Sequence, residues 1–298
     1  MNIPSFTAIL RLTLSPIVFV LTLAGCVTKS NDFERVQLVE YAQIEESARG
    51  ETSGIVKSRL YEGIYWIHGD SGDDPNVFPI KKNGEIASAN HSQGVELEGL
   101  KNIDWEDIGV DVSGNLIVAD IGNNCLCRVD KSILIFPEPD VNAKKVSNYQ
   151  RFYIAYPESA NSSESIEEQT PDAEAVFYKD EVIYILTKEP GGNDTKLYKL
   201  VSPDQSSINA LIHVITLDFD DKVTAADLSV SGDSLVVLTS SSVWLFTNFE
   251  GEDYFSGNSS RVYFKANQVE SVAFTGEGSV IIAEEEGQLY EIQISDFK

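Results

Sequence analysis

The sequence predicts an all-β fold, and within that class a β-propeller with five four-stranded antiparallel blades around a central channel. Two observations lead to this prediction. A pair of strand-like runs joined by a polar turn occurs five times along the 298 residues, and one or two more such runs follow each pair. Short antiparallel strands that repeat in fours at intervals of roughly 40–60 residues are typical of propeller blades. A sixth blade stays open as an alternative, because the second and third pairs are widely spaced.

The clearest pair begins at Glu106. Its strand-like runs, 108–112 and 116–119, carry apolar residues on both sides of the Ser-Gly-Asn turn at 113–115. Such runs on either side of a Gly/Asn turn predict a β-hairpin. The other copies begin at Ser53, Ala173, Ala226 and Glu270.

Further strand-like runs complete the expected blades. The N-terminal run 36–44 has no partner hairpin, and we expect it to supply the outer strand of the last blade, which removes a free sheet edge. Third strands are expected at 77–80, 133–136, 196–200, 243–246 and 289–294, and fourth strands at 151–156, 211–217 and 261–265.

The first 26 residues differ from the rest of the chain. Arg11 precedes an apolar run at 12–23, and the segment ends in Leu23-Ala24-Gly25-Cys26. A basic residue, a short apolar core and small residues predict a secretory signal, too short for a spanning helix. Leu-Ala-Gly-Cys matches the lipobox of bacterial lipoproteins, although an ordinary cysteine near a cleavage site is the alternative. We expect a signal peptide over 1–25, a tether over 26–35 lipidated at Cys26, and one propeller domain over 36–298.

The expected lipid anchor also suggests a location. Several acyl chains hold a protein on a membrane more firmly than one. Val27 follows Cys26, at the position where Asp usually marks retention in the inner membrane. By resemblance to other lipoproteins, we expect anchoring in the outer membrane on its periplasmic side.

The charge of the chain restricts its partners. Removing Arg11 with the signal leaves 21 Lys and Arg residues against 47 Asp and Glu residues, a net charge of −26. Nucleic acid and anionic lipid surfaces need a basic face and are therefore disfavoured as partners. Strong acidity favours cations, or only solubility. We expect a monomer that meets an envelope protein or a small-molecule ligand.

The two cysteines that follow Cys26 in the chain, Cys125 and Cys127, are separated by one residue. In an oxidising compartment they can form a disulfide. They can also form half of a soft-metal site, although no His or Cys cluster in the sequence completes it.

A candidate calcium site follows from overlaying the five hairpins. Each innermost strand begins with an oxygen-bearing side chain, and these side chains are expected to meet at one mouth of the channel. Clustered carboxylates raise one another's pKa, and a divalent cation removes that cost. Ca²⁺ takes six to eight oxygen ligands, whereas zinc favours His and Cys. The predicted ligands are Ser53, Glu106, Glu174, Asp227 and Glu270, with Asp107, Asp172 and Ser271 as neighbours if the overlay shifts by one residue.

The alternative for these residues is structural, as caps of strand starts or as hydrogen-bond partners of neighbouring blades. A second polar group follows the second strands, which run opposite to the first, and we expect it near the other face. It is a separate rim, a minor ion site in the loop 70–76, or a set of solvated loop residues. Its members are Asp70, Asp73, Asp74, Asp120, Lys188, Glu189, Glu284 and Glu285.

Several segments carry a family resemblance, among them SGIVKSRLYEGIYWIHGDSGD, DWEDIGVDVSGNLIVADIGNN and LTKEPGGNDTKLYKL. Over most of the chain after Glu51 they resemble a group of uncharacterised bacterial secreted propeller proteins, which implies the fold and no reaction. The blade starts are also similar to those of the calcium-activated nucleotidases (apyrases), five-bladed propellers with calcium in the channel. That resemblance implies metal-ligand roles for Ser53, Glu106 and Glu174. The likeness to propeller phytases and lactonases is architectural.

Two functions are therefore expected. The first is a lipid-anchored, calcium-binding propeller that acts as a ligand- or partner-binding module in the cell envelope. The alternative is a calcium-dependent hydrolase of phosphoesters, phosphoanhydrides or lactones, in which the metal polarises the substrate and Glu106 or Asp107 orients water. No nucleophile with an adjacent base is evident, so no catalytic residue is predicted.

Overall fold

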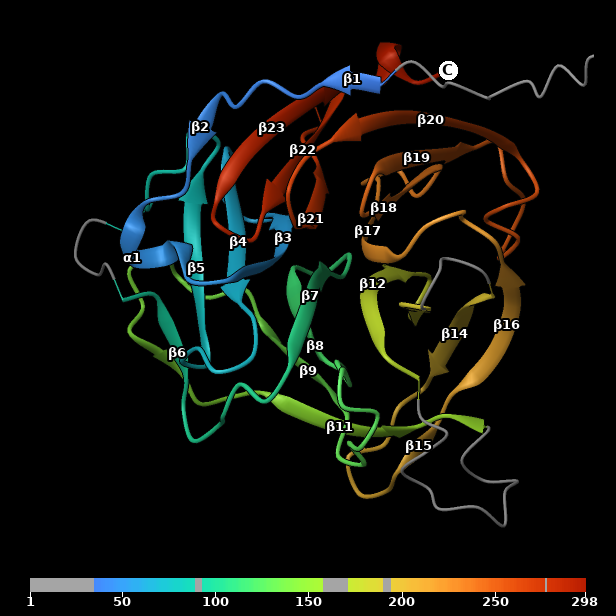
Figure 1. The fold of residues 1–298 in the computed structure, drawn as a ribbon. Coiled ribbons are helices and arrows are strands. Elements are labelled where there is room, and N and C mark those ends of the chain that lie inside the picture. Colours follow the sequence, from blue (N-terminus) through green and yellow to red (C-terminus); the bar gives the residue numbers. More distant parts are fainter. Residues whose placement is uncertain (1–34, 89–92, 158–170, 190–193, 277) are drawn as a thin grey trace, which may run out of the picture. The chain divides into compact units, whose positions relative to one another are not determined.

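The computed structural model describes residues 35–88, 93–157, 171–189, 194–276 and 278–298 (Figure 1). The expected signal peptide, the lipidation site Cys26 and all of the expected tether except Arg35 lie outside the described residues. Residues Glu34–Lys298 form one compact unit. No helix in the described part of the chain combines the length and apolar character that crossing a membrane requires.

Five sheets surround a common axis in this unit, so the predicted five-bladed β-propeller is confirmed. Each blade places its first strand innermost, and each innermost strand contacts the next one until the fifth contacts the first. The innermost strands are β3 (Thr52–Lys57), β7 (Trp105–Val110), β12 (Ala173–Lys179), β17 (Val223–Leu228) and β21 (Val269–Phe274).

The first two blades continue outward from β3 and β7 by antiparallel pairing. Each ends in a short fifth strand that pairs in parallel. The first blade adds β4 (Ile64–Gly69), β5 (Asn76–Lys81), β6 (Val95–Leu97) and β10 (Lys145–Val146). The second adds β8 (Asn115–Asp120), β9 (Ser132–Pro137), β11 (Gln150–Ala155) and β15 (Asn209–Ala210).

The third and fourth blades continue from β12 and β17 by antiparallel pairing, and only the fourth of these two ends in a short strand that pairs in parallel. The third adds β13 (Val182–Thr187), β14 (Thr195–Val201) and β16 (Ile212–Leu217). The fourth adds β18 (Ser234–Thr239), β19 (Ser242–Thr247), β20 (Asn258–Lys265) and β1 (Arg35–Gln37).

The fifth blade adds β22 (Ser279–Glu284), β23 (Gln288–Gln293) and β2 (Ala42–Gln43) to β21. The N-terminal strand β2 pairs antiparallel with β23, so the expected closure of the last blade by the N-terminal segment is confirmed there. Strand β1 differs from the prediction, because it pairs in parallel with β20 of the fourth blade. Two short helices, α1 (Glu46–Arg49) and η3 (Ile294–Asp296), complete the described elements.

Apolar clusters fill the space between neighbouring blades. One cluster joins Ile117 and Ala119 of β8 to Val176 and Ile185 of the third blade. Because both faces of a blade are covered, the inner strands carry unbroken apolar runs, such as Leu-Ile-Val-Ala in β8. Burial of each large apolar side chain contributes about 1.5–3 kcal/mol. This packing fixes the inner strands, and with them the side chains at their ends.

Candidate metal site

Each innermost strand starts with a β-bulge. In every blade, the pairing between the first and second strands skips one residue near the start of the first. A bulge twists the strand and changes the direction of a side chain. The skipped residues all carry side-chain oxygen: Ser53, Glu106, Glu174, Thr224 and Glu270.

Four of the five predicted ligands therefore occupy equivalent positions, and the placement of Asp227 is corrected. Thr224 is the equivalent residue in the fourth blade, and Asp227 lies three residues farther along β17. There Asp227 Oδ2 accepts a hydrogen bond of 2.8 Å from the Phe274 backbone N–H of the next blade. Desolvation raises the pKa of Asp227 to about 7. Asp227 thus matches the structural alternative, a hydrogen-bond partner of a neighbouring blade.

Carboxylates from three blades converge at the start of β7. They form two groups that share Glu106, and within each group one oxygen per residue lies within 4.8 Å of the others. We call the five residues the acidic cluster. One group is Asp70, Asp104 and Glu106, and the other is Glu106, Asp172 and Glu174.

The second polar group does not form a rim at the other face. Antiparallel pairing places the end of a second strand beside the start of the first, as Thr52 opposite Gly69 and Trp105 opposite Asp120 show. Asp70 follows β4 and therefore reaches Glu106. The predicted separation of the two groups was wrong, and the antiparallel direction of the strands is the reason.

Burial makes the acidic cluster costly to ionise. Glu106 and Glu174 are 3% and 1% exposed. Desolvation, followed by the charge of Glu174, raises the pKa of Glu106 well above its usual value. Desolvation also raises the pKa of Glu174 to about 8 and that of Asp104 to about 6. Without a cation, the cluster therefore holds protons near neutral pH.

The most direct sign of a ligand is one oxygen of Glu106. Glu106 Oε1 is buried and has no hydrogen-bond partner among the described residues. A buried polar atom without a partner is rare in folded proteins and costs free energy. Gly122 provides the space for this oxygen, since a Cβ at Gly122 would lie 1.8 Å from Glu106 Oε1 and 2.6 Å from Asp104 Oδ2. The unpartnered oxygen therefore lies among other carboxylates that can share a cation.

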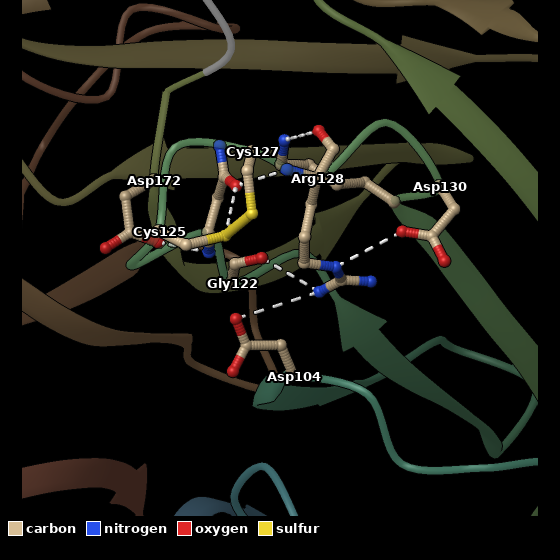
Figure 2. The surroundings of a disulfide bond; sticks show 9 residues. Asp104, Gly122, Cys125, Cys127, Arg128, Asp130 and Asp172 are labelled. Carbon is tan, nitrogen blue, oxygen red and sulfur yellow. Dashed lines mark hydrogen bonds and ion pairs between the residues drawn. A yellow bond between two sulfur atoms is a disulfide. The ribbon is translucent and has the colours of Figure 1, made fainter. Parts of the chain in front are cut away.

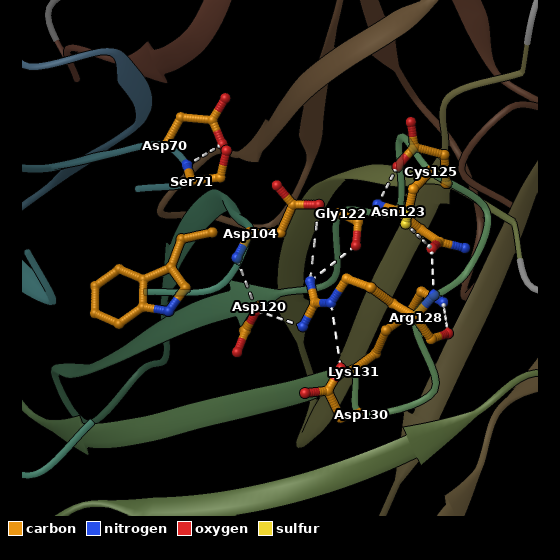
Figure 3. Close-up of polar contacts among 12 residues, drawn as sticks. Asp70, Ser71, Asp104, Asp120, Gly122, Asn123, Cys125, Arg128, Asp130 and Lys131 are labelled. Carbon is orange, nitrogen blue, oxygen red and sulfur yellow. Dashed lines mark hydrogen bonds and ion pairs between the residues drawn. The ribbon is translucent and has the colours of Figure 1, made fainter. Parts of the chain in front are cut away.

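Two basic side chains border the acidic cluster. Lys188 Nζ lies 2.9 Å from Glu174 Oε1, and Arg128 Nη1 lies 3.8 Å from Asp104 Oδ2. Burial opposes the charge on Lys188, but the carboxylates of Glu174, Glu270 and Glu106 together outweigh burial, and the pKa of Lys188 is raised. Figure 3 shows Asp104 between Asp70 and Arg128. These two positive charges are fewer than the five carboxyl groups, so the cluster would be net negative if all five were ionised.

Ser53 and Glu270 lie outside both groups. The Ser53 hydroxyl donates a 2.8 Å hydrogen bond to the Glu106 backbone carbonyl, which ties the first blade to the second. Glu270 is half-buried, its pKa is raised to about 7 mainly by desolvation, and its charge acts on Glu174 and Lys188. Glu270 therefore belongs to the same electrostatic environment without joining a group.

Asp107 connects three blades. Its Oδ2 accepts hydrogen bonds from the backbone N–H groups of Val176, at 2.8 Å, and of Ala226, at 3.4 Å. Its Oδ1 accepts one of 2.8 Å from the N–H of Ile108. Desolvation raises the pKa of this fully buried carboxyl. These bonds give Asp107 the structural role that was the alternative for the whole ring.

A loop between β8 and β9 contacts the acidic cluster. Cys125 and Cys127 are joined by a disulfide, so the disulfide alternative is confirmed and the metal half-site was wrong (Figure 2). The backbone N–H of Asn123 donates a 2.6 Å hydrogen bond to Asp172 Oδ1. Arg128 Nη2 lies 2.8 Å from Asp120 Oδ1. Through Arg128 the loop contacts Asp104, and through Asn123 it contacts Asp172, so two members of the acidic cluster depend on the conformation of this loop.

Sequence reasoning missed Asp104 and placed Asp70 at the wrong face. Asp104 stands two residues before Glu106 in the segment Asp-Trp-Glu-Asp, and this local repetition of acids was the available signal. Asp172, one of the neighbours considered, stands two residues before Glu174 in the same relation. An acid two residues before each bulged Glu is therefore shared by the second and third blades.

Comparisons with known proteins support the fold. No protein-family model matches the chain, and no curated protein matches it. The structure is similar to the PQQ-bound aldose sugar dehydrogenase of Streptomyces coelicolor, with a TM-score of 0.50 and 8% identity over 87% of this chain and 97% of that one. It is also similar to XC5397, a gluconolactonase of Xanthomonas campestris, with a TM-score of 0.48 and 11% identity over 88% and 95%.

A third similar structure is PorZ, a component of the type-IX secretion system of Porphyromonas gingivalis. The TM-score is 0.36 with 12% identity, and the match covers 82% of this chain but 25% of PorZ. This chain thus matches a quarter of the length of PorZ and nearly the whole length of the other two. At these identities the likeness concerns the fold, and the chain is a β-propeller protein.

Proposed function

We propose that the acidic cluster binds a calcium ion, and that the protein is a lipoprotein of the outer membrane whose calcium-loaded propeller binds a ligand or partner in the envelope. The unpartnered, buried Glu106 Oε1 carries this proposal. The cation would satisfy that oxygen and replace the protons that the raised pKa values otherwise retain.

The donor set favours calcium over other metals. Every side chain in the acidic cluster offers carboxylate oxygen, which Ca²⁺ accepts in irregular arrangements of six to eight ligands. Mg²⁺ demands near-octahedral geometry, and zinc prefers nitrogen or sulfur. Glu106 belongs to both groups of carboxylates, so we assign the ion to Glu106, with further ligands drawn from both groups, Asp104 and Asp172 among them.

Binding is favoured over catalysis because the described histidines are poorly placed to act as bases. His68 is fully buried, its Nδ1 donates to the Gly69 carbonyl at 2.9 Å, and desolvation lowers its pKa to about 4. His213 lies on β16, the outermost strand of its blade. His91 lies outside the described residues.

Hydrolysis remains the second candidate, and one observation favours it. Lys188 and Arg128 supply positive charge beside the acidic cluster, which an anionic substrate oxygen needs in a chain of net charge −25. In that case the bound calcium would polarise the substrate oxygen and Glu106 would orient water. A screen of phosphoesters, nucleotides and lactones with calcium present separates the candidates, and turnover lost in Glu106→Gln would select the hydrolase.

Anchoring is proposed from the lipobox. Leu-Ala-Gly-Cys ends at Cys26, about eight residues before the compact unit that starts at Glu34. Mass spectrometry of the protein from bacterial membranes is expected to find acyl chains on an N-terminal Cys26. A Cys26→Ala variant is expected to lose membrane association, and unchanged association would contradict the anchor.

Calcium-dependent melting tests the ion. A ligand at a hundred times its Kd stabilises the folded state by about 2.7 kcal/mol, which raises the Tm of a domain of this size by roughly 5–10 °C. We expect this shift in the wild type and its loss in Glu106→Gln. Glu62→Gln, an exposed position in the turn between β3 and β4, is the matched control and is expected to keep the shift. If calcium leaves the Tm of the wild type unchanged, as it is expected to in Glu106→Gln, the proposal is contradicted.

A further inference from the structure

The disulfide loop combines an accessible bond with a buried contact. Cys125 and Cys127 are exposed, whereas Asn123, two residues before the bridge, is fully buried. Exchange of a disulfide requires access of an attacking thiolate to sulfur, and this bridge offers it. A chemical change at the exposed bridge is therefore two residues away from Asn123, which is hydrogen-bonded to Asp172 of the acidic cluster.

Asn123 transmits the loop conformation to the cluster. Its N–H donates the 2.6 Å hydrogen bond to Asp172 Oδ1. Its side-chain Oδ1 accepts the Arg128 N–H at 2.8 Å, and its carbonyl accepts the Leu126 N–H at 2.7 Å. These last two bonds close the loop on both sides of the disulfide. Asn123 keeps its position toward Asp172 only while the loop stays folded.

The bridged segment holds an unfavourable backbone conformation. Leu126, between the two cysteines, has a φ of +52°. A residue with a Cβ rarely adopts this left-handed region, because the side chain approaches the following carbonyl. The disulfide constrains Leu126 from both sides. Opening the bridge therefore allows Leu126 to leave the left-handed region. We expect the hydrogen bond from the Leu126 N–H to the Asn123 carbonyl to break when it does.

Asn123 supports cation binding by holding Asp172, whereas Arg128 opposes cation binding, and the effect of Arg128 is the weaker of the two. Its positive charge near Asp104 disfavours a bound cation, but that contact is long, at 3.8 Å. Arg128 is also held by Asp120, at 2.8 Å, and by the Gly122 carbonyl, at 2.8 Å. These partners lie outside the bridged segment, so Arg128 is expected to stay in place when the bridge opens. The loss of the hydrogen bond from Asn123 to Asp172 then determines the net change in cation affinity on reduction.

We propose that the Cys125–Cys127 disulfide is a thiol-exchange site whose reduction weakens cation binding by the acidic cluster. This inference rests on the proposed function. The reductant is a dithiol, either small or carried by a protein. Its thiolate attacks one sulfur to form a mixed disulfide, and its second thiol then releases the protein dithiol. The S–S bond of the loop breaks, two S–H bonds form, and the dithiol becomes a disulfide in a two-electron exchange.

The test measures calcium binding by isothermal titration on the full chain purified in detergent, oxidised and after treatment with a dithiol. Alkylation and mass spectrometry establish the thiol state of Cys125 and Cys127. Reduction is expected to raise the calcium Kd roughly 10-fold. This is the low end of the effect of losing a hydrogen-bond partner of a metal ligand, here Asp172. Asn123→Ala is expected to bind calcium like the reduced protein in both redox states.

The double variant Cys125→Ser/Cys127→Ser separates the bridge from the reductant. It is expected to have the calcium Kd of the reduced wild type, and this Kd is expected to be the same with and without the dithiol. Equal affinity of the oxidised and reduced wild type would overturn the switch and leave the calcium site standing. A bridge that native protein does not open to the dithiol, but unfolded protein does, would overturn thiol exchange. Absence of calcium binding by oxidised protein would remove the proposed function and the switch together.

Discussion

Glu106 and Glu174 start the innermost strands of adjacent blades, and one carboxylate oxygen of each lies within 4.8 Å of the other. Both residues occupy a β-bulge, and both are almost completely buried. Two acids so close in a poorly solvated place repel each other unless a proton or a cation intervenes. This relationship makes the stability of the propeller sensitive to pH, to calcium and to the neighbouring basic residues.

The stability of the calcium-free protein is expected to fall as the pH rises. Asp104, Glu270 and Glu174 have pKa values raised to about 6, 7 and 8. At these three groups the folded state therefore binds more protons than the unfolded state above about pH 4. The resulting stabilisation is fully present below that pH and is lost as the pH rises through about 6–8.

Melting curves from about pH 5 to about pH 9 with a chelator measure this loss, since ionisation is then uncompensated. Excess calcium is expected to remove or reverse the decline, because the ion binds the deprotonated carboxylates. A calcium-free Tm that rises between pH 6 and pH 8 would contradict the raised pKa values.

Lys188 is expected to compete with calcium. Lys188→Met removes the 2.9 Å partner of Glu174 and leaves that buried carboxyl uncompensated. The calcium-free protein is expected to lose on the order of 3 kcal/mol in its free energy of unfolding. Calcium is expected to stabilise this variant more than the wild type. Chemical denaturation with and without calcium measures both effects, and an unchanged calcium increment would show that Lys188 does not compete.

Gly122→Ala is expected to damage the metal site without unfolding the blade. The new Cβ would displace Glu106 Oε1 and Asp104 Oδ2, which are the ends of flexible side chains. Calcium affinity is expected to fall by roughly 10-fold or more, because two ligands move. Gly109→Ala is the matched control, since its Cβ would meet only ordinary contacts near 3.8 Å. Titration calorimetry compares them, and equal calcium affinity would exclude Gly122 from shaping the site.

Asp107→Ala is expected to destabilise the propeller in the presence and absence of calcium alike. The change leaves the N–H groups of Val176 and Ala226 without their acceptor near the axis. The expected cost is on the order of 3 kcal/mol for two buried donors. Denaturant unfolding measures it. A selective loss of calcium binding with unchanged stability would instead identify Asp107 as a ligand.

The repeat made the fold predictable from the sequence. Five hairpins with polar starts identify the innermost strands, and the same starts identify Ser53, Glu106, Glu174 and Glu270. The prediction for the fourth blade was wrong because its bulged residue, Thr224, carries a hydroxyl. An overlay based on acidic residues selected Asp227 instead. A bulge shifts the register without leaving a residue type that marks it.

The rest of the candidate site depends on contacts between distant segments. Asp70 and Asp172 reach Glu106 from other blades, and Asn123 reaches Asp172 from a loop 49 residues away in sequence. No local pattern encodes such proximity, because it arises when the blades close into a ring. The direction of the second strands was available from the antiparallel pairing, and using it places Asp70 and Lys188 at the correct face.

Direct metal analysis tests the central claim most simply. Purified protein is dialysed against calcium-containing buffer and then against metal-free buffer, and bound calcium is counted by atomic emission. We expect one calcium ion per chain in the wild type and in Glu62→Gln, and none in Glu106→Gln, because the two groups share Glu106 and together hold a single ion. A wild-type protein without bound calcium, whose titration also shows no binding at millimolar calcium, would contradict the account.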